Sequence, residues 1–90
     1  MKPAVPVTHG PSPFREAVHF HLDLDHPALL EVHTVTGKCI HWAALSAGRG
    51  IHTWNLTTLD GAPAPSGLYF YQVMLPGGGL LSEGRLVVLR

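Results

Sequence analysis

The stretch "SGLYFYQV", residues 66–73, decides the fold, because it reads as a β-strand without a polar face. A strand with one side in water alternates apolar and polar residues, but residues 68–71 are all apolar or aromatic. We expect Tyr69, Tyr71 and Val73 to fill a core, with the tyrosine hydroxyls reaching its rim. The opposite set then needs a cover, which would be either the proline-rich N-terminal arm or a partner protein.

The segments around this strand predict a small all-β domain. "PGGG" (76–79) separates it from "LLSEGRLVVLR" (80–90), which indicates a hairpin with glycines available for positive φ. Further strand-like runs, separated by turn residues, are residues 17–22, 28–35, 39–45 and 51–59. The tight turn "TGK" (36–38) predicts a second hairpin between residues 28–35 and 39–45. These six strands, or seven with one in the arm, predict an Ig-like or fibronectin-like antiparallel β-sandwich.

The first 13 residues differ in composition from the rest of the chain. They contain four prolines, at positions 3, 6, 11 and 13, which favours an extended arm or linker with at most an edge strand at Ala4–Val7. We therefore assign residues 1–13 to an arm and residues 14–90 to the β-sandwich domain.

The composition of the 90-residue chain excludes several classes of protein. Hydrophobic residues make up 46% and charged residues 13% of the chain, which argues against disorder. The formal net charge is zero, so bulk charge would not attract nucleic acid. No apolar run is long enough for a transmembrane helix, and the start of the chain does not read as a signal peptide. The single cysteine, Cys39, cannot form an intrachain disulfide, and we expect it to point inward.

Seven histidines make a metal site the first chemical possibility to consider. His19 and His21 share one face of a strand, and His33 lies on the outer face of the next strand. These three are weak metal candidates; the simpler interpretation is an ordinary polar face. We recognise no nucleophile with its base and no cofactor loop, so we expect no catalytic residue, no enzymatic activity, no cofactor and no small-molecule substrate.

The candidate partner-binding residues are large apolar side chains. They are Leu68, Phe70 and Met74, which the alternation directs away from the core, and Trp42. Trp42 is either a core residue or an exposed aromatic for a partner, whereas Trp54 is expected in the core. Docking by edge-strand addition is a further possibility, since it supplies main-chain hydrogen bonds.

The order of several short motifs resembles a known family. "PSPF" (11–14), "LLEVHTVTGKCI" (29–40), "AGRGIHTWN" (47–55), "DGAPAPSGLYFYQV" (60–73) and "GRLVVLR" (84–90) resemble, in this order, the Ig-like domain of the flagellar hook-capping protein. They are also similar to the C-terminal module of type IX secretion cargo. The resemblance covers about residues 11–90, and Asn55 and Leu56 stand where that family has Asp-Gly after the tryptophan.

The resemblance implies an interaction or sorting role without catalytic residues. On this basis the chain is expected to be an accessory subunit or docking domain of a larger protein assembly, with membrane-bound partners as one option. The alternative is a C-terminal sorting or anchoring domain of a secreted protein. Both roles imply a location in the periplasm or at the cell surface, while the lack of a recognisable signal peptide leaves a cytoplasmic location open.

Overall fold

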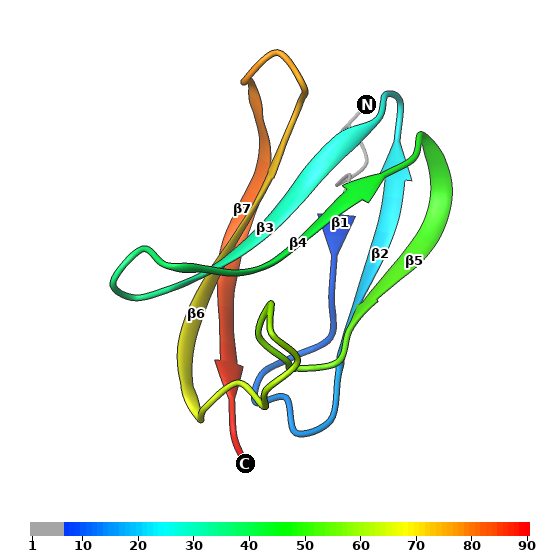
Figure 1. The fold of residues 1–90 in the computed structure, drawn as a ribbon. Helices are drawn as coiled ribbons and strands as arrows, with labels where there is room; N and C mark the ends of the chain where they lie inside the picture. Colours follow the sequence, from blue (N-terminus) through cyan, green and yellow to red (C-terminus); the bar gives the residue numbers. More distant parts are fainter. Residues whose placement is uncertain (1–6) are drawn as a thin grey trace.

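Residues 7–90 are described by the structure, a computed structural model, and they form two antiparallel β-sheets packed face to face (Figure 1). The three-stranded sheet has the order β1-β2-β5, from β1 (Val7–Thr8), β2 (Val18–Leu24) and β5 (Gly48–Trp54). The four-stranded sheet has the order β4-β3-β6-β7, from β3 (Ala28–Thr34), β4 (Cys39–Leu45), β6 (Gly67–Met74) and β7 (Leu80–Val88). The predicted small β-sandwich of six to seven strands is confirmed, and both predicted hairpins are present.

The core lies between the two sheets and follows the alternation of the sequence. Tyr69, Tyr71 and Val73 of β6 are buried there, as predicted from the opening stretch, and Trp54 is fully buried. The Tyr71 ring packs edge to face on Phe20 of β2, with the ring centroids 5.2 Å apart. Aromatic pairs of this geometry add to the stability that apolar burial provides. The Tyr69 hydroxyl reaches the rim of the core, where it donates a hydrogen bond to the carbonyl of Pro65 at 2.6 Å.

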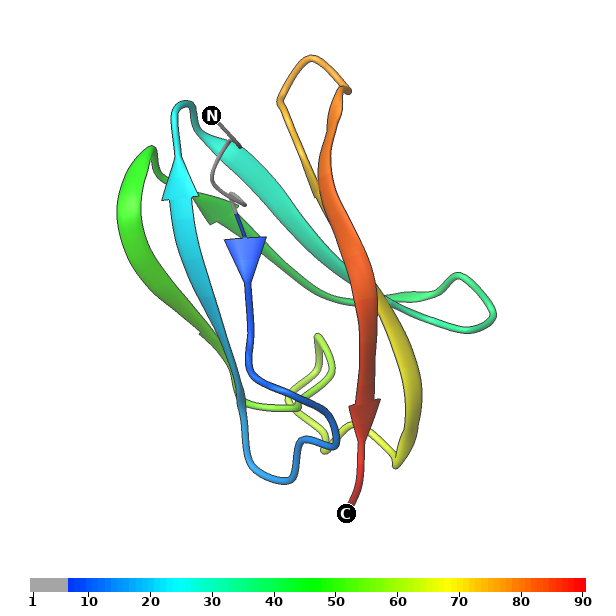
Figure 2. The ribbon, with the colours of Figure 1, turned by 180° about the vertical axis from the view of Figure 1, so that it is seen from behind.

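Part of the expected arm belongs to the sandwich. Val7 and Thr8 pair with Leu22 and His21 of β2, and the side chain of Val7 is buried in the core. Residues 4–6 of the expected edge strand lie outside the described residues. After β1 the chain crosses toward β7, where Phe14 pairs with Val88 and joins the two sheets at this end (Figure 2). None of the described residues forms a helix long and apolar enough to span a membrane.

A β-bulge in the β3–β4 hairpin changes which side chains of β4 face the core. Val32 pairs with His41 but His33 pairs with Cys39, so that Ile40 is the extra residue. Ile40 is buried and His41 stacks on buried Trp54, whereas Cys39 is only half-buried and lies beside Glu31 and His33. The expectation that Cys39 points inward is therefore wrong, because the bulge shifts the alternation of β4 by one residue.

β5 begins and ends earlier than the sequence pattern predicts. It starts at Gly48, inside the expected turn, and ends at Trp54 rather than near residue 59. The chain then turns around the buried indole, whose Nε1 donates a hydrogen bond to the carbonyl of Thr57 at 2.8 Å. In the loop between β5 and β6, the carbonyls of Leu56 and Ala64 accept hydrogen bonds from the side chain of Arg90. The loop thus covers the end of the core beside Trp54.

Candidate functional site

The candidate site is the outer face of the four-stranded sheet. In the register of the sheet, Trp42 pairs with Glu31 and Glu31 pairs with Gln72. Since alternate residues of a strand share a face, Leu68, Phe70 and Met74 of β6 lie on the same face as Trp42. The four residues predicted to bind a partner are therefore brought together on one surface, although the sequence alone did not show that β4 and β6 belong to one sheet.

Large apolar side chains on this outer face are open to solvent. Trp42 is 56% exposed, while Leu68 and Phe70 are each 39% exposed. Of the two expected positions of Trp42, the structure has the exposed one. Val87 pairs with Leu68 and adds an apolar side chain that is 41% exposed, which the sequence reasoning missed. The alternation of residues 80–90 carried the signal, because it places residues 83, 85 and 87 on one side of the strand.

The described part of the arm does not form a strand beside β6. Its backbone pairs with β2 at residues 7–8 and with Val88 of β7 at Phe14. Ser12 accepts a hydrogen bond from the backbone of Val87 at 3.1 Å. Within residues 7–90, these contacts tie the arm to the sheet edges, and Leu68 and Phe70 keep the exposure given above.

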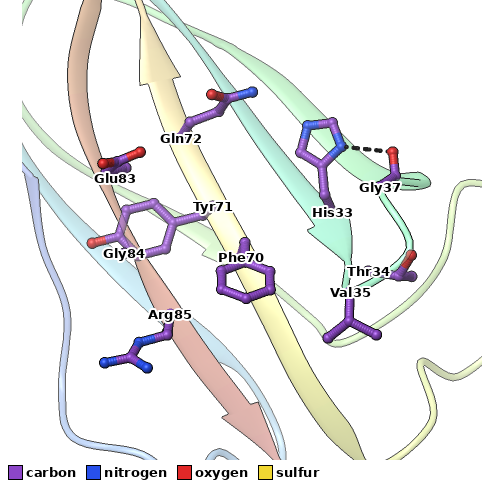
Figure 3. Close-up of a pocket in the computed structure, with 10 residues that line it drawn as sticks. All are labelled: His33, Thr34, Val35, Gly37, Phe70, Tyr71, Gln72, Glu83, Gly84 and Arg85. Carbon is purple, nitrogen blue, oxygen red and sulfur yellow. Dashed lines mark hydrogen bonds between the residues drawn. The ribbon is translucent and has the colours of Figure 1, made fainter.

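A groove of about 660 Å³ crosses the outer face between the β3–β4 turn and β7 (Figure 3). The ring of Phe70 lies in the middle of the view, between Val35 of the turn and Arg85 of β7. The other lining residues are His33, Thr34, Gly37, Tyr71, Gln72, Glu83 and Gly84. An apolar centre with charged side chains of both signs along one wall suits contact with a protein surface of mixed character.

The three candidate metal-binding histidines do not converge. His19 and His21 lie on the exposed face of β2 in the three-stranded sheet, where His19 Nδ1 lies 2.9 Å from Thr53 Oγ1. His33 lies on the outer face of the opposite sheet. The core separates these two faces, so no metal ion can bridge His33 to His19 or His21.

A different pair of histidines is in contact across the sandwich. His41 of β4 and His52 of β5 lie on edge strands of the two sheets, and their rings stack on each other. Their Nε2 atoms are 2.9 Å apart, so one ring donates the hydrogen bond and the other must be neutral to accept it. Burial, followed by the charge of His52, lowers the pKa of His41 to about 4. Burial also lowers the pKa of His52. The sequence reasoning missed this pair, because β4 and β5 lie in different sheets and their contact across the sandwich is not visible in the sequence.

Comparisons with known proteins show the fold alone. No protein-family model matches the chain, and no curated protein matches its sequence. Two solved structures from Porphyromonas gingivalis contain the same fold, dimeric latent PorU and PorZ, an essential bacterial surface component of the type IX secretion system. PorU superposes with a TM-score of 0.76 at 23% identity over 92% of this chain. PorZ superposes with a TM-score of 0.70 at 22% identity over 93% of this chain.

The chain corresponds to only a small part of each of these proteins. The match covers 9% of the PorU chain and 11% of the PorZ chain. The similarity therefore concerns one β-sandwich within much longer chains, and such a unit is a module of a larger protein in both cases.

Proposed function

We propose that this β-sandwich is a non-enzymatic docking module of an extracytoplasmic protein assembly, and that it binds its partner through the outer face of the four-stranded sheet. The observation that carries the proposal is the gathering of Trp42, Leu68, Phe70 and Val87 on that face with more than a third of each side chain exposed. Exposed aromatic side chains of this kind are typical anchors of protein interfaces. Met74 lies half-buried at the other end of the same strand face.

The known proteins with this fold support the setting of the proposal. PorZ is a surface component of the type IX secretion system, and the matching unit is a small part of a long chain. The motif order resembles the Ig-like domain of the hook-capping protein and the sorting modules of type IX cargo, which also act within larger assemblies. The proposed partner is therefore a protein located outside the cytoplasm, and this includes membrane-bound proteins.

The proposal also treats the chain as non-enzymatic. The groove beside Phe70 combines aromatic and aliphatic side chains with Glu83, Arg85 and His33, a composition suited to contact. Assay of the purified chain for hydrolytic activity on peptide and ester substrates would test this point. Substrate turnover that persists after the exposed apolar residues are replaced would contradict the non-enzymatic role.

Replacing both Trp42 and Phe70 with serine should weaken capture of the partner at least tenfold, since each change removes an aromatic anchor from the proposed interface. The partner is obtained by co-purification with the tagged chain from its native source, and its affinity for the variants is then measured with the purified protein. Neither side chain is part of the core, so the melting temperature should change little.

Ile51→Ser is the matched control for the docking experiment. Ile51 is 62% exposed, but it pairs with His21 on the outer face of the three-stranded sheet. The proposal requires full affinity in this variant. Equal losses in Ile51→Ser and in the double variant would contradict docking through the four-stranded sheet.

A sorting or anchoring role is the second candidate function. It is favoured by the motif order and by the occurrence of the fold as a minor part of a longer chain. Fusion of residues 1–90 to a periplasmic reporter in cells with a type IX system separates the two candidates. Export of the reporter to the surface would support sorting, and retention in the periplasm would count against it.

A further inference from the structure

We propose that Glu31, His33 and Cys39 form a binding site for Zn²⁺ on the β3–β4 hairpin. One ligand atom from each side chain lies within 4.8 Å of the other two, and all three residues are half-buried. Within residues 7–90 this is the one group of three or more His, Cys, Asp or Glu side chains close enough to share a metal ion. Metal binding at this site is separate from docking to a partner protein, and it can be measured on the chain alone.

The β-bulge creates this cluster. It places Cys39 directly opposite His33, and Glu31 lies two residues before His33 on the same face of β3. In a regular hairpin with Val32 opposite His41, residue 40 would face His33 and Cys39 would lie one position further along. The sequence reasoning named His33 alone, because the two other ligands depend on the bulge.

The ring of His33 is already oriented as a metal ligand requires. Its Nδ1 lies 3.3 Å from the carbonyl oxygen of Gly37 (Figure 3), and its Nε2 lies 3.2 Å from Oε1 of Glu31. Both oxygens can only accept, so in each contact the ring nitrogen is the donor when it carries a proton. A metal ion bound between Nε2 and Oε1 would take the place of the proton on Nε2 and leave the Nδ1–H to the Gly37 carbonyl. Histidines that bind metals commonly donate their other N–H to a backbone carbonyl in this way.

The positive φ of Gly37 (89°) fits the tight turn that holds this carbonyl in place. The turn is closed by hydrogen bonds of 2.9 Å from the Thr34 backbone nitrogen to the Lys38 carbonyl and from the Gly37 nitrogen to the Thr34 carbonyl. The ligand-orienting group is therefore part of the hairpin backbone rather than a mobile side chain.

The donor set selects the class of metal. A thiolate, an imidazole and a carboxylate together suit Zn²⁺, whereas Mg²⁺ and Ca²⁺ prefer oxygen ligands only. Ligands around a tetrahedral zinc lie about 3.3–3.6 Å apart, given bond lengths of about 2.0–2.3 Å. Each ligand pair therefore needs to close by at most about 1.5 Å, which side-chain rotation on a half-exposed surface can supply. The fourth position is left for water or for a ligand from a partner.

Titration of Zn²⁺ into the reduced, purified 90-residue chain tests the proposal. Calorimetry should show one Zn²⁺ per chain, and Co²⁺ in its place should give the sulfur-to-cobalt charge-transfer absorption that a thiolate ligand produces. The variants Cys39→Ser and His33→Gln should each weaken binding at least tenfold. His19→Gln, on the other sheet, should bind as tightly as the unmodified chain, and Mg²⁺ should not bind.

Alkylation of the unmodified chain tests the site even if one of the variants does not fold. Zn²⁺ should slow alkylation of the Cys39 thiol at least tenfold, and His33→Gln should abolish the protection. Zinc binding that persists in Cys39→Ser, or a thiol whose alkylation is unaffected by Zn²⁺, would overturn the site.

Discussion

Gly84→Ala should lower the free energy of unfolding by about 2–3 kcal/mol in urea at neutral pH, because the added methyl group overpacks the core. Gly84 of β7 pairs with Tyr71 of β6. A Cβ atom at position 84 would lie 2.7 Å from Cε1 and from the hydroxyl oxygen of Tyr71. The ring has little room to retreat, since its other side packs on Phe20 and on His9 at a centroid distance of 5.4 Å.

Gly50→Ala is the matched control for this prediction. Gly50 also lies within a strand, but no heavy atom lies within 4 Å of the place of its Cβ. Alanine there should be neutral or stabilising by up to about 1 kcal/mol, because glycine is unfavourable inside a strand. Combining Gly84→Ala with Tyr71→Leu should cost less than the sum of the single changes. Equal losses in the two alanine variants, or strict additivity in the pair, would refute the clash.

The sandwich could be predicted because its signals are local. Alternation assigned Tyr69, Tyr71 and Val73 to the core, and the glycines of residues 77–79 together with Thr36-Gly37 indicated both hairpins. These features depend on neighbours in sequence, which a single chain displays. The exposed position of Phe70 followed from the same alternation, so half of the candidate docking face was visible without coordinates.

The rest depends on pairings that a single sequence does not display. Trp42 joins Phe70 on one face only because β3 lies between β4 and β6. The bulge after His41 turns Ile40 toward the core and Cys39 outward, whereas His41 faces the core opposite Val32 as it would in a regular strand. The assignment of Cys39 failed for this reason, and the Glu31–His33–Cys39 cluster and the His41–His52 pair were not foreseen.

The His41–His52 pair should make the chain sensitive to acid. Between pH 7.5 and pH 5 we expect the free energy of unfolding to fall by about 1 kcal/mol, reduced from the full linkage value because both rings are partly exposed. Both histidines have a lower pKa in the folded chain than the ordinary value of 6.5, and that of His41 is about 4. Below pH 6.5 the unfolded chain therefore binds more protons than the folded chain, and stability is lost as the pH falls.

The structural cause of this sensitivity is the loss of a hydrogen-bond acceptor. With Nε2 atoms 2.9 Å apart, protonation of both rings would bring two N–H donors together. The rings also stack, His41 on Trp54 at 5.8 Å and His52 on Phe20 at 6.5 Å, so they separate only by disturbing the core. Acid should consequently loosen the edge formed by β4 and β5 before it affects the β6–β7 hairpin.

Urea unfolding of the unmodified chain and of His41→Gln at pH 7.5 and at pH 5 measures this effect. The glutamine variant should lose at least half of the pH dependence, because it removes the ring with the larger shift while keeping a group that can hydrogen-bond to His52. His21→Gln, an exposed histidine on the outer face of β2, should keep the full dependence. A pH slope that is the same in all three proteins would show that the carboxylates, rather than the histidine pair, cause the acid sensitivity.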